Sequence, residues 1–552
     1  MITHSEGHVM GEAVYAETEL DCFHLFMTPQ ILKHIVDMTN RKIKNKIDNS
    51  TREGLIQLKK NNNYVRQITL QDLEAFIGLM YLRGLLGWNN FDAERIFHHQ
   101  FGHPVFRATM SYNRFRFILA NLTFDNLDTR QERWQYDRFA ANREIFEDWN
   151  KKCAQMIQMD KFGTIDECLY ACRNQVAFRQ YNKSKPAKYG ILIKCVNEVS
   201  FPYTHHSAVF AGKPQVIEDG MNPYYTNTVL EVTLNMLRSV GLFSDLRGRN
   251  ITFDNLYTSI PLAEIMWDQM KCTLVGTLKS NRKGLPKEVV NNYKKRESLS
   301  YEVYWREDKP YMTFHSYVVK SKSKGKKNVC ILSTMTPILG VTKDDGHKKP
   351  AIYKFYDFTK GGTDIVDQRS DKYTTSTKNR RWSIKTWEYM LDVTRVNSQT
   401  IHSLNHGLAP SEVRKVNSFK FGWDLGISLI KPLCMERKKC ITLRKSVRSL
   451  IDGLFPNEEI SQHALPGLFG HVDDPQPIEP VRGVNLFPHT AEHDKRVRCH
   501  ICVQNVKQGT GRKAAWDKLP KWKTHCAMCD LSVCKNHAYN VCNSCSENLT
   551  KN

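Results

Sequence analysis

The sequence predicts a multidomain α+β protein that combines a helical region, a β-containing core and a small cysteine-rich module. Three observations lead to this fold class. Apolar residues recur at helical spacing up to about residue 160, short apolar strands then alternate with helices, and seven of the 16 cysteines fall between Cys499 and Cys545. The 552 residues, 41% of them hydrophobic, suffice for three or four packed domains.

The chain carries a formal net charge of +23 and has a pI near 9.3. A charge of this size favours a polyanionic partner, of which nucleic acid is the commonest, although a merely basic protein is the alternative. No window approaches 18 consecutive apolar residues, so no membrane span is expected. The first 20 residues lack the basic start and apolar run of a signal peptide, which predicts a protein on the reducing side of the cell.

Residues 20–162 are expected to be helical. Thr69 followed by Asp72 is typical of a helix start, apolar residues then recur at helical spacing, and Gly87 suits the stop. A second helix is expected from about Ser111. Its apolar stripe indicates helical core, and its arginines offer the alternative that the helix lies along phosphates.

From residue 163 the pattern changes to short apolar or alternating segments separated by turn residues. The expected elements are strands at 163–170, 175–181 and 188–199, a helix at 228–240, a strand at 250–253, a helix at 260–270 and a strand at 272–278. Three strands, helix, strand, helix, strand is the order of an RNase H-like fold.

A β-rich insertion with basic runs is expected next, followed by more helices and a linker that contains six prolines. The expected domains are a disordered N-terminus (1–19), a helical DNA-binding and dimerisation domain (20–162 and 377–454), an RNase H-like catalytic domain (163–279 and 353–376), a β-rich insertion (280–352), a linker (455–494) and a cysteine-rich zinc-binding domain (495–552).

Four aspartates are candidates for a two-metal phosphodiesterase site. Asp166 lies in the first strand and Asp254 ends the strand at 250–253, so adjacent strands of one sheet can bring them together although they are 88 positions apart. Asp364 and Asp367 open a helix, and their spacing of three puts both on one face. Two Mg²⁺ ions about 3.5–4 Å apart need such hard carboxylate ligands. The alternative for each aspartate is a turn or helix cap.

Five segments in this order resemble the successive motifs of piggyBac transposases: TIDE, FRQYNKSKPAKYGI, FDNLYTS, GTLKSNRKGLP and KGGTDIVDQ with NRRW after it. The resemblance covers roughly residues 20 to 548. It implies that Asp166, Asp254 and Asp364 are the catalytic triad that holds Mg²⁺ or Mn²⁺, that Asp367 is a further essential aspartate, and that Trp382 lies near the transposon end, with a core aromatic as the alternative. The basic residues expected to contact DNA in this region are Arg173, Lys188, Arg380 and Arg381.

The resemblance also implies the chemistry: nicking of the transposon end, hairpin formation, hairpin opening and strand transfer into TTAA targets. It implies double-stranded DNA as partner, at the terminal inverted repeats and the target, and we expect a homodimer on paired transposon ends. A nuclear location is expected from this chemistry and from basic runs such as residues 320–327, with solvated loops as the alternative for such runs. No Walker-type phosphate loop occurs, so no nucleotide cofactor is expected. The family commonly has Arg-Gly-Arg where this chain has Arg173, Asn174 and Gln175. That departure, with a short N-terminus, supports the alternative of a domesticated, catalytically silent DNA-binding protein.

Four cysteine and histidine pairs near the C-terminal end predict two tetrahedral Zn²⁺ sites. A cross-brace would place one zinc on Cys499, Cys502, Cys534 and His537, and the other on Cys526, Cys529, Cys542 and Cys545. A sequential arrangement remains open, and His500, His525 and Cys440 are competing ligands.

Basic residues alternate with Trp516 and Trp522 in this module, and Arg512 and Lys513 are expected to contact DNA. The resemblance agrees, because the family's cysteine-rich domain binds the terminal inverted repeats. Histidine stands sixth among the eight ligands, which disfavours a ubiquitin ligase or histone-tail reader.

Overall fold

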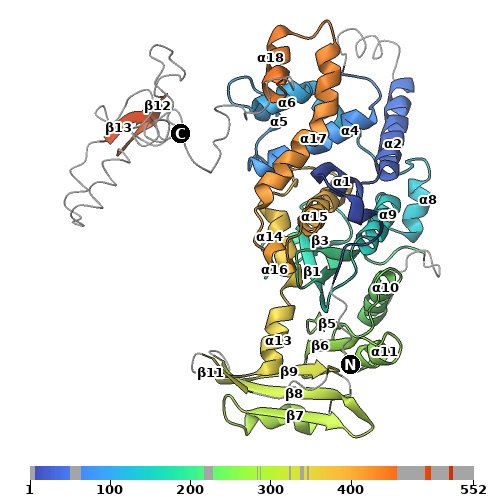
Figure 1. Ribbon diagram of the computed structural model, residues 1–552, viewed down its shortest axis with the longest axis vertical. Helices are drawn as coiled ribbons and strands as arrows, with labels where there is room; N and C mark the ends of the chain where they lie inside the picture. Colours follow the sequence, from blue (N-terminus) through green and yellow to red (C-terminus); the bar gives the residue numbers. More distant parts are fainter. Residues whose placement is uncertain are drawn as a thin grey trace. The chain divides into compact units, whose positions relative to one another are not determined.

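The computed structural model describes residues 7–49, 64–216, 228–321 without Lys283 and Pro286, 325–335, 341–344, 347–456, 491–498 and 521–525. The chain forms two compact units, Met1–Phe455 and Pro456–Asn552 (Figure 1). The first unit is a mixed α+β structure, as expected. In the second unit the structure describes two antiparallel strands, β12 (Ala491–Arg498) and β13 (Lys521–His525).

The N-terminal part of the first unit is helical. Its elements are η1 (Gly11–Tyr15), α1 (Glu19–His24), α2 (Pro29–Asp48), α4 (Leu70–Leu85), α5 (Ala93–Ile96), α6 (Pro104–Thr109), α7 (Tyr112–Asn121), α8 (Arg130–Tyr136) and α9 (Arg143–Gln155).

Local sequence signals set the ends of two of these helices as expected. Thr69 and Asp72 form a reciprocal capping box at the start of α4, and Gly87 adopts a φ of +70° just after it. The Ser111 hydroxyl accepts a hydrogen bond from the Arg114 backbone N–H and so caps α7. The Arg114 guanidinium is buried against Asp72 at 2.8 Å, so its charge is used inside the helical region.

In the part of the chain that the structure describes, the central sheet has nine strands. They are β1 (Phe162–Ala171), β2 (Arg179–Tyr181), β3 (Tyr189–Glu198), β4 (Thr204–Val209), β5 (Asn250–Phe253), β6 (Thr273–Leu278), β7 (Tyr301–Arg306), β8 (Lys309–Ser321) and β9 (Gly325–Ser333). The spatial order of the first part is β4, β3, β1, β5, β6. The pairs β4–β3 and β3–β1 are antiparallel, whereas β1–β5 and β5–β6 are parallel.

The three-strand meander differs from the expected one. The segment expected as a strand at 175–181 contributes only Arg179–Tyr181, and the third full-length strand is β4, which was not predicted. β4 carries His205, His206 and Ser207 at fully buried positions, so its sequence lacks an apolar face. Another element pairs with part of it: the Ser207 backbone N–H and C=O both hydrogen-bond to the Asn150 amide of α9.

The helices that follow β4 agree with expectation: α10 is Val229–Gly241 and α11 is Ile260–Asp268. In the segment expected as a β-rich insertion, α12 (Lys287–Asn291) and η2 (Asn292–Lys294) precede three strands that extend the central sheet, because β9 pairs antiparallel with β6. A two-stranded ribbon of β10 (Val341–Asp344) and β11 (His347–Pro350) leads into α13 (Ala351–Thr359) and α14 (Gly362–Lys372).

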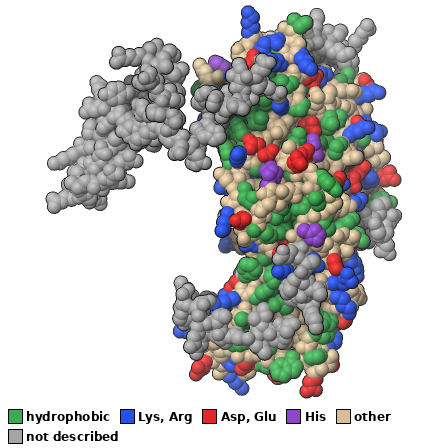
Figure 2. Space-filling view, viewed as in Figure 1, with side chains coloured by type: hydrophobic (Ala, Val, Ile, Leu, Met, Phe, Trp, Pro, Cys, Tyr) green, Lys and Arg blue, Asp and Glu red, His purple; other side chains and the backbone are tan. Residues whose placement is uncertain are grey.

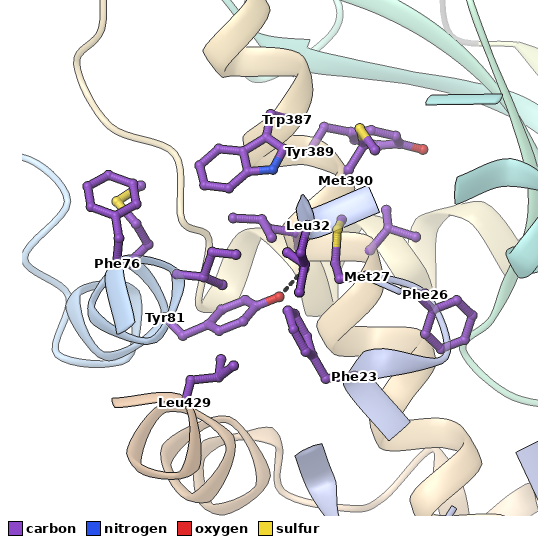
Figure 3. Close-up of a cluster of buried hydrophobic side chains, with 14 of the residues drawn as sticks. Phe23, Phe26, Met27, Leu32, Phe76, Tyr81, Trp387, Tyr389, Met390 and Leu429 are labelled. Carbon is purple, nitrogen blue, oxygen red and sulfur yellow. Dashed lines mark hydrogen bonds between the residues drawn. The ribbon is translucent and has the colours of Figure 1, made fainter. Parts of the chain in front are cut away.

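Helix α15 (Trp382–Asn405) joins the helical region to the sheet and is buried along nearly its whole length. Trp387 stacks on Phe76 of α4, and the Tyr81 hydroxyl donates to the Leu391 carbonyl at 2.8 Å (Figure 3). On the sheet side, Tyr389 lies edge-on to Tyr170 of β1. The remaining helices are α16 (Pro410–Val413), α17 (Ser418–Lys439) and α18 (Lys445–Leu454).

No helix in the described part of the chain is long and apolar enough to cross a membrane. All nine cysteines from Cys22 to Cys440 are free thiols.

Candidate active site

Asp166 and Asp254 lie at the same end of two neighbouring parallel strands. Ile165 of β1 pairs with Phe253, the last residue of β5; Asp166 follows Ile165 within β1, and Asp254 is the first residue after β5. Parallel strands in register carry equivalent residues side by side. The register thus brings the backbones of Asp166 and Asp254 to the same end of the β1–β5 pair, and a shared catalytic role of the two carboxylates stays a prediction.

The chain after Asp254 is held in a tight turn. One Asp254 carboxylate oxygen accepts the Leu256 backbone N–H at 2.6 Å, and the Asp254 carbonyl accepts the Thr258 hydroxyl at 2.7 Å. The Arg282 guanidinium donates to the Asn255 carbonyl at 2.9 Å. Two of the motifs quoted above, FDNLYTS and GTLKSNRKGLP, thus meet in space, and the second supports the turn that carries Asp254.

Helix α14 lies against β1 and β3, and two contacts fix its first turn. A Cβ on Gly362 would be 2.6 Å from both the Glu198 carbonyl oxygen and the Thr164 side chain, so only glycine permits this approach. The Asn197 amide donates to the Thr363 hydroxyl at 2.8 Å. Asp364 follows directly in the first turn of the helix.

The carboxylates of this region influence each other. The pKa of Asp166 is raised, first by burial and then by the negative charges of Asp254 and Asp364, with Lys185 opposing. The pKa of Asp367 is raised to about 7 by burial, with further contributions from the charges of Asp371 and Asp364, and it interacts with the Cys168 thiol of β1. All four expected aspartates therefore belong to one electrostatic cluster across β1, β5 and α14.

Among the described residues, no three Asp, Glu, His or Cys side chains are already gathered as a cation site. The donor set nevertheless fits a hard divalent cation, because Asp166, Asp254 and Asp364 offer only carboxylate oxygens. The mutual repulsion that raises the Asp166 pKa is also what a bound cation would relieve.

Two residues that were not singled out from the sequence lie beside the aspartates. The Lys185 ammonium donates to the Glu167 carbonyl at 2.7 Å. Its positive charge opposes the rise in the pKa of both Asp166 and Asp367. Glu167 has its own pKa raised by burial, opposed by the nearly buried Lys194. Lys185 belongs to the KSKPAKYG stretch. The sequence feature that could have identified it was a lysine inside a motif that was otherwise interpreted as a turn.

Three of the expected DNA-contacting residues line two pockets that share Arg173. One pocket of about 590 Å³ is lined by Arg173, Arg179 and Lys188 with neighbouring residues. The other, of about 500 Å³, is lined by Arg173, Lys378 and Arg380. Figure 2 shows Lys and Arg side chains interspersed with Asp and Glu over the visible face. Arg173, Lys188 and Arg380 are therefore grouped by the pockets that they line, and not by a uniformly positive surface.

Comparison with known proteins decides the family. A family model described as Transposase IS4 matches residues 18–399. The chain belongs to this transposase family and is of the piggyBac type. It is 21% identical over 351 residues to human PiggyBac transposable element-derived protein 3, covering 61% of this chain and 55% of that protein. The same identity and length relate it to the human Chimeric ERCC6-PGBD3 protein, of which 31% is covered.

The chain thus spans about half or less of the length of these curated relatives. Its structure is similar to the solved cryo-EM structure of a piggyBac transposase synaptic complex with hairpin DNA. The TM-score is 0.70 and the sequence identity 25%, over 98% of this chain and all of that one.

In this piggyBac-type chain, Arg381 and Trp382 are engaged within the fold. The Arg381 guanidinium donates to the carbonyls of Leu119 and Leu122 at the end of α7, at 2.6 Å for Leu122. Trp382 is half-buried between Phe139 and Phe178, with ring centroids 5.8 and 5.1 Å away. The packing matches the core-aromatic alternative for Trp382, and DNA contact by either residue stays a prediction.

The loop before α15 is anchored by two buried carboxylates of that helix. Asp392 accepts the Thr375 N–H at 2.7 Å and the hydroxyl of Tyr170 of β1 at 2.9 Å. Glu388 accepts the Thr377 hydroxyl at 2.8 Å and pairs with Lys385 at 2.9 Å. The loop that carries Lys378 and Arg380 is therefore tied to the strand that carries Asp166.

All eight expected zinc ligands lie outside the described residues, as do Arg512 and Lys513.

Proposed function

We propose that this chain is a DNA transposase that cuts and joins phosphodiester bonds at the Asp166–Asp254–Asp364 cluster. The supporting observation is the register of the parallel strands β1 and β5, in which Asp166 and Asp254 directly follow the paired residues Ile165 and Phe253. The strand order β4-β3-β1-β5-β6 supports an RNase H-like nuclease core. In keeping with the piggyBac type, the reaction is nicking, hairpin formation and strand transfer into TTAA targets.

Asp166, Asp254 and Asp364 would hold Mg²⁺ or Mn²⁺. When bound, a pair of such ions lowers the pKa of an attacking water or 3′-hydroxyl and stabilises the leaving oxygen. The chain's own residues position the carboxylates. The turn bonds of Asp254, the glycine contact of α14 and the backbone bond of Lys185 fix where the carboxylates stand. Asp367 acts beside them through its contact with Cys168 and its proximity to Asp364.

Double-stranded DNA is the proposed substrate, at transposon ends and at the target. The two basic pockets around Arg173 suit phosphates, since guanidinium and ammonium groups bind them with charge-assisted hydrogen bonds. The similar solved structure is titled as a synaptic complex with hairpin DNA, which supports the same partner for this chain. We further propose a homodimer, two Zn²⁺ ions in the cysteine-rich module and a nuclear location.

The test is cleavage of a labelled duplex that carries the element's own ends, with Mg²⁺ and zinc-loaded full chain. Asp254→Asn keeps the oxygen that accepts the Leu256 N–H and removes the charge, so it should fold and not cut. Asp245→Asn, at an exposed aspartate outside the cluster, is the matched control and should cut like the wild type. Nicks that persist in Asp254→Asn would refute the assignment.

A second candidate is a DNA-binding protein that keeps the fold without cutting. It is favoured by Arg173-Asn174-Gln175 in place of Arg-Gly-Arg, which removes one positive charge beside the pockets. The human relative is named as transposable element-derived. Zinc-loaded protein that binds the ends and makes no nick with Mg²⁺ or Mn²⁺ would establish this alternative.

A further inference from the structure

The hairpin formed by β2 and β3 carries an exposed pair of tyrosines that the proposed active site does not use. Tyr181 and Tyr189 are 59% and 43% exposed and stand directly opposite each other in the antiparallel register. Their ring centroids are 4.8 Å apart with the ring planes at 45°. Residues directly opposite on paired strands share one face of the sheet.

The surroundings of this pair are strongly basic. The Arg179 guanidinium lies 5.1 Å from the centre of the Tyr189 ring, and Tyr189 lines the pocket it shares with Arg173 and Lys188. Between residues 173 and 190 the chain has five Lys or Arg residues and no Asp or Glu. Aromatic rings at a basic surface match the composition of single-stranded nucleic-acid sites.

Hydrogen bonds define the turn between the two strands that carry the rings. The Asn182 N–H donates to the Lys188 carbonyl at 2.8 Å, and the Asn182 side chain accepts the Ser184 N–H at 3.0 Å. Lys188 adopts a left-handed backbone with φ +54°, which returns the chain directly into Tyr189. The turn also carries Lys185, which bonds to the strand of Asp166. The pair therefore belongs to a hairpin whose turn is hydrogen-bonded to the active-site strand.

The distance of the tyrosine pair from the proposed catalytic aspartates limits which part of the DNA the rings can contact. Asp166 pairs with Cys195 of β3, and Tyr189 lies six residues earlier on that strand, a separation of roughly 20 Å. The rings are thus too far to contact the reacting phosphate and near enough to contact nucleotides beside it. In an intact duplex the base faces are covered by neighbouring bases, so exposed rings gain stacking only with unpaired bases.

We propose that Tyr181 and Tyr189 form a stacking platform for unpaired bases of the DNA strand that flanks the cleavage position. The role of this platform in the reaction rests on the proposed function. Its binding of unpaired bases can be measured independently of DNA cleavage. Cut strands and hairpins expose unpaired bases, and the basic residues around the pair hold the backbone while the rings hold the bases. The two tyrosines are positioning residues and take no part in bond making.

The experiment is fluorescence titration of zinc-loaded full chain with a 12-nucleotide single strand containing 2-aminopurine, and with the same strand in a duplex. Stacking on tyrosine quenches the probe. Replacing both tyrosines by valine keeps strand-forming residues and removes the rings. This variant should lose at least about tenfold in single-strand affinity together with the quench, while duplex affinity stays within about twofold. Replacing both by phenylalanine should restore single-strand binding.

Trp305→Ala is the matched control, since Trp305 is 67% exposed on β7, a different strand of the sheet, and should bind as the wild type does. An undiminished quench in the double valine variant would overturn the platform. So would equal losses for single strand and duplex, which would mean that the pair acts only through the shape of the hairpin. Asp254→Asn should bind and quench normally, so a failed cleavage assay and a failed platform are separate results.

Discussion

Asp166 and Asp254 lie 88 residues apart in the chain, yet each directly follows one member of the paired positions Ile165 and Phe253 of β1 and β5. The parallel pairing of β1 with β5 makes this placement a property of the backbone. Asp364 reaches the same region from α14, whose approach depends on a glycine contact with two strands. The geometry of the cluster thus depends on residues that carry no charge.

Gly362→Ala should displace α14 and weaken the site without changing any charged residue. The added methyl would lie 2.6 Å from the Thr164 side chain and 2.6 Å from the Glu198 carbonyl oxygen, and this backbone oxygen cannot move without shifting β3. We expect a cost of about 1–3 kcal/mol in stability and a fall in cleavage larger than this cost explains. Gly361→Ala is the control, because open space surrounds that position. Thermal melting and single-turnover cleavage measure both effects, and unchanged cleavage in Gly362→Ala would contradict the role given to α14.

Neighbouring arginines at the start of α15 should behave differently. Arg381 donates to carbonyls at the end of α7, so Arg381→Ala should lower the melting temperature. Arg380 is exposed at a basic pocket, so Arg380→Ala should leave stability unchanged and reduce duplex affinity, with a shallower dependence on salt. Melting curves and salt-dependent binding separate the two. A destabilised Arg380→Ala, or an Arg381→Ala that only loses DNA binding, would reverse the assignment.

Glu388 should give folding a specific pH dependence. Burial raises the pKa of Glu388 to about 7 from an ordinary 4.5, against the opposing effect of Lys385. The folded protein therefore binds a proton more tightly than the unfolded chain does. The resulting stabilisation is complete below about pH 4.5 and is lost as pH rises through about 7.

The melting temperature of the wild type, measured relative to Glu388→Gln, should accordingly fall between pH 4.5 and 7 and level off above. Glu132→Gln, at an exposed glutamate, should show no such trend relative to the wild type. If the melting temperature of the wild type instead rose relative to that of Glu388→Gln as pH increases, the ionised form of Glu388 would be the one that folding favours.

The cysteine-rich module should bind two Zn²⁺ per chain. Elemental analysis of purified protein should give a zinc ratio of about two, and Cys526→Ser with Cys529→Ser should lower it to about one. In a cross-brace the remaining zinc stays on the other four ligands. Cys440→Ser, at an exposed thiol in the first unit, should leave the ratio at two. A ratio of zero or one in the wild type would contradict the paired assignment.

Sequence reasoning located those parts of the structure that depend on local signals. The capping box of Thr69 and Asp72 is encoded within four residues, and the short buried strand β5 directly precedes Asp254, so both were predictable. The position of α14 was predictable from its aspartates, and the meeting of β1 and β5 followed from the expected fold.

Other features depend on contacts that are distant in the chain. Strand β4 was missed because His205 and His206 are buried without an apolar alternation, and its pairing with Asn150 is visible only in three dimensions. The partners of Arg381 are backbone carbonyls about 260 residues away, which no side-chain pattern reveals. Lys185 was missed for a related reason, since its bond is to the carbonyl of Glu167.

The measurement that tests the central claim most directly is Mn²⁺ binding to the zinc-loaded, DNA-bound chain, followed by electron paramagnetic resonance. The claim is that Asp166, Asp254 and Asp364 act as one divalent-cation site, and Mn²⁺ favours the same carboxylate ligands as Mg²⁺. The wild type should bind about two Mn²⁺ ions in competition with Mg²⁺, and an Asn substitution at any one of the three aspartates should weaken that binding by more than about 100-fold. Asp245→Asn should bind as the wild type does. Tight Mn²⁺ binding that survives all three substitutions would contradict the claim.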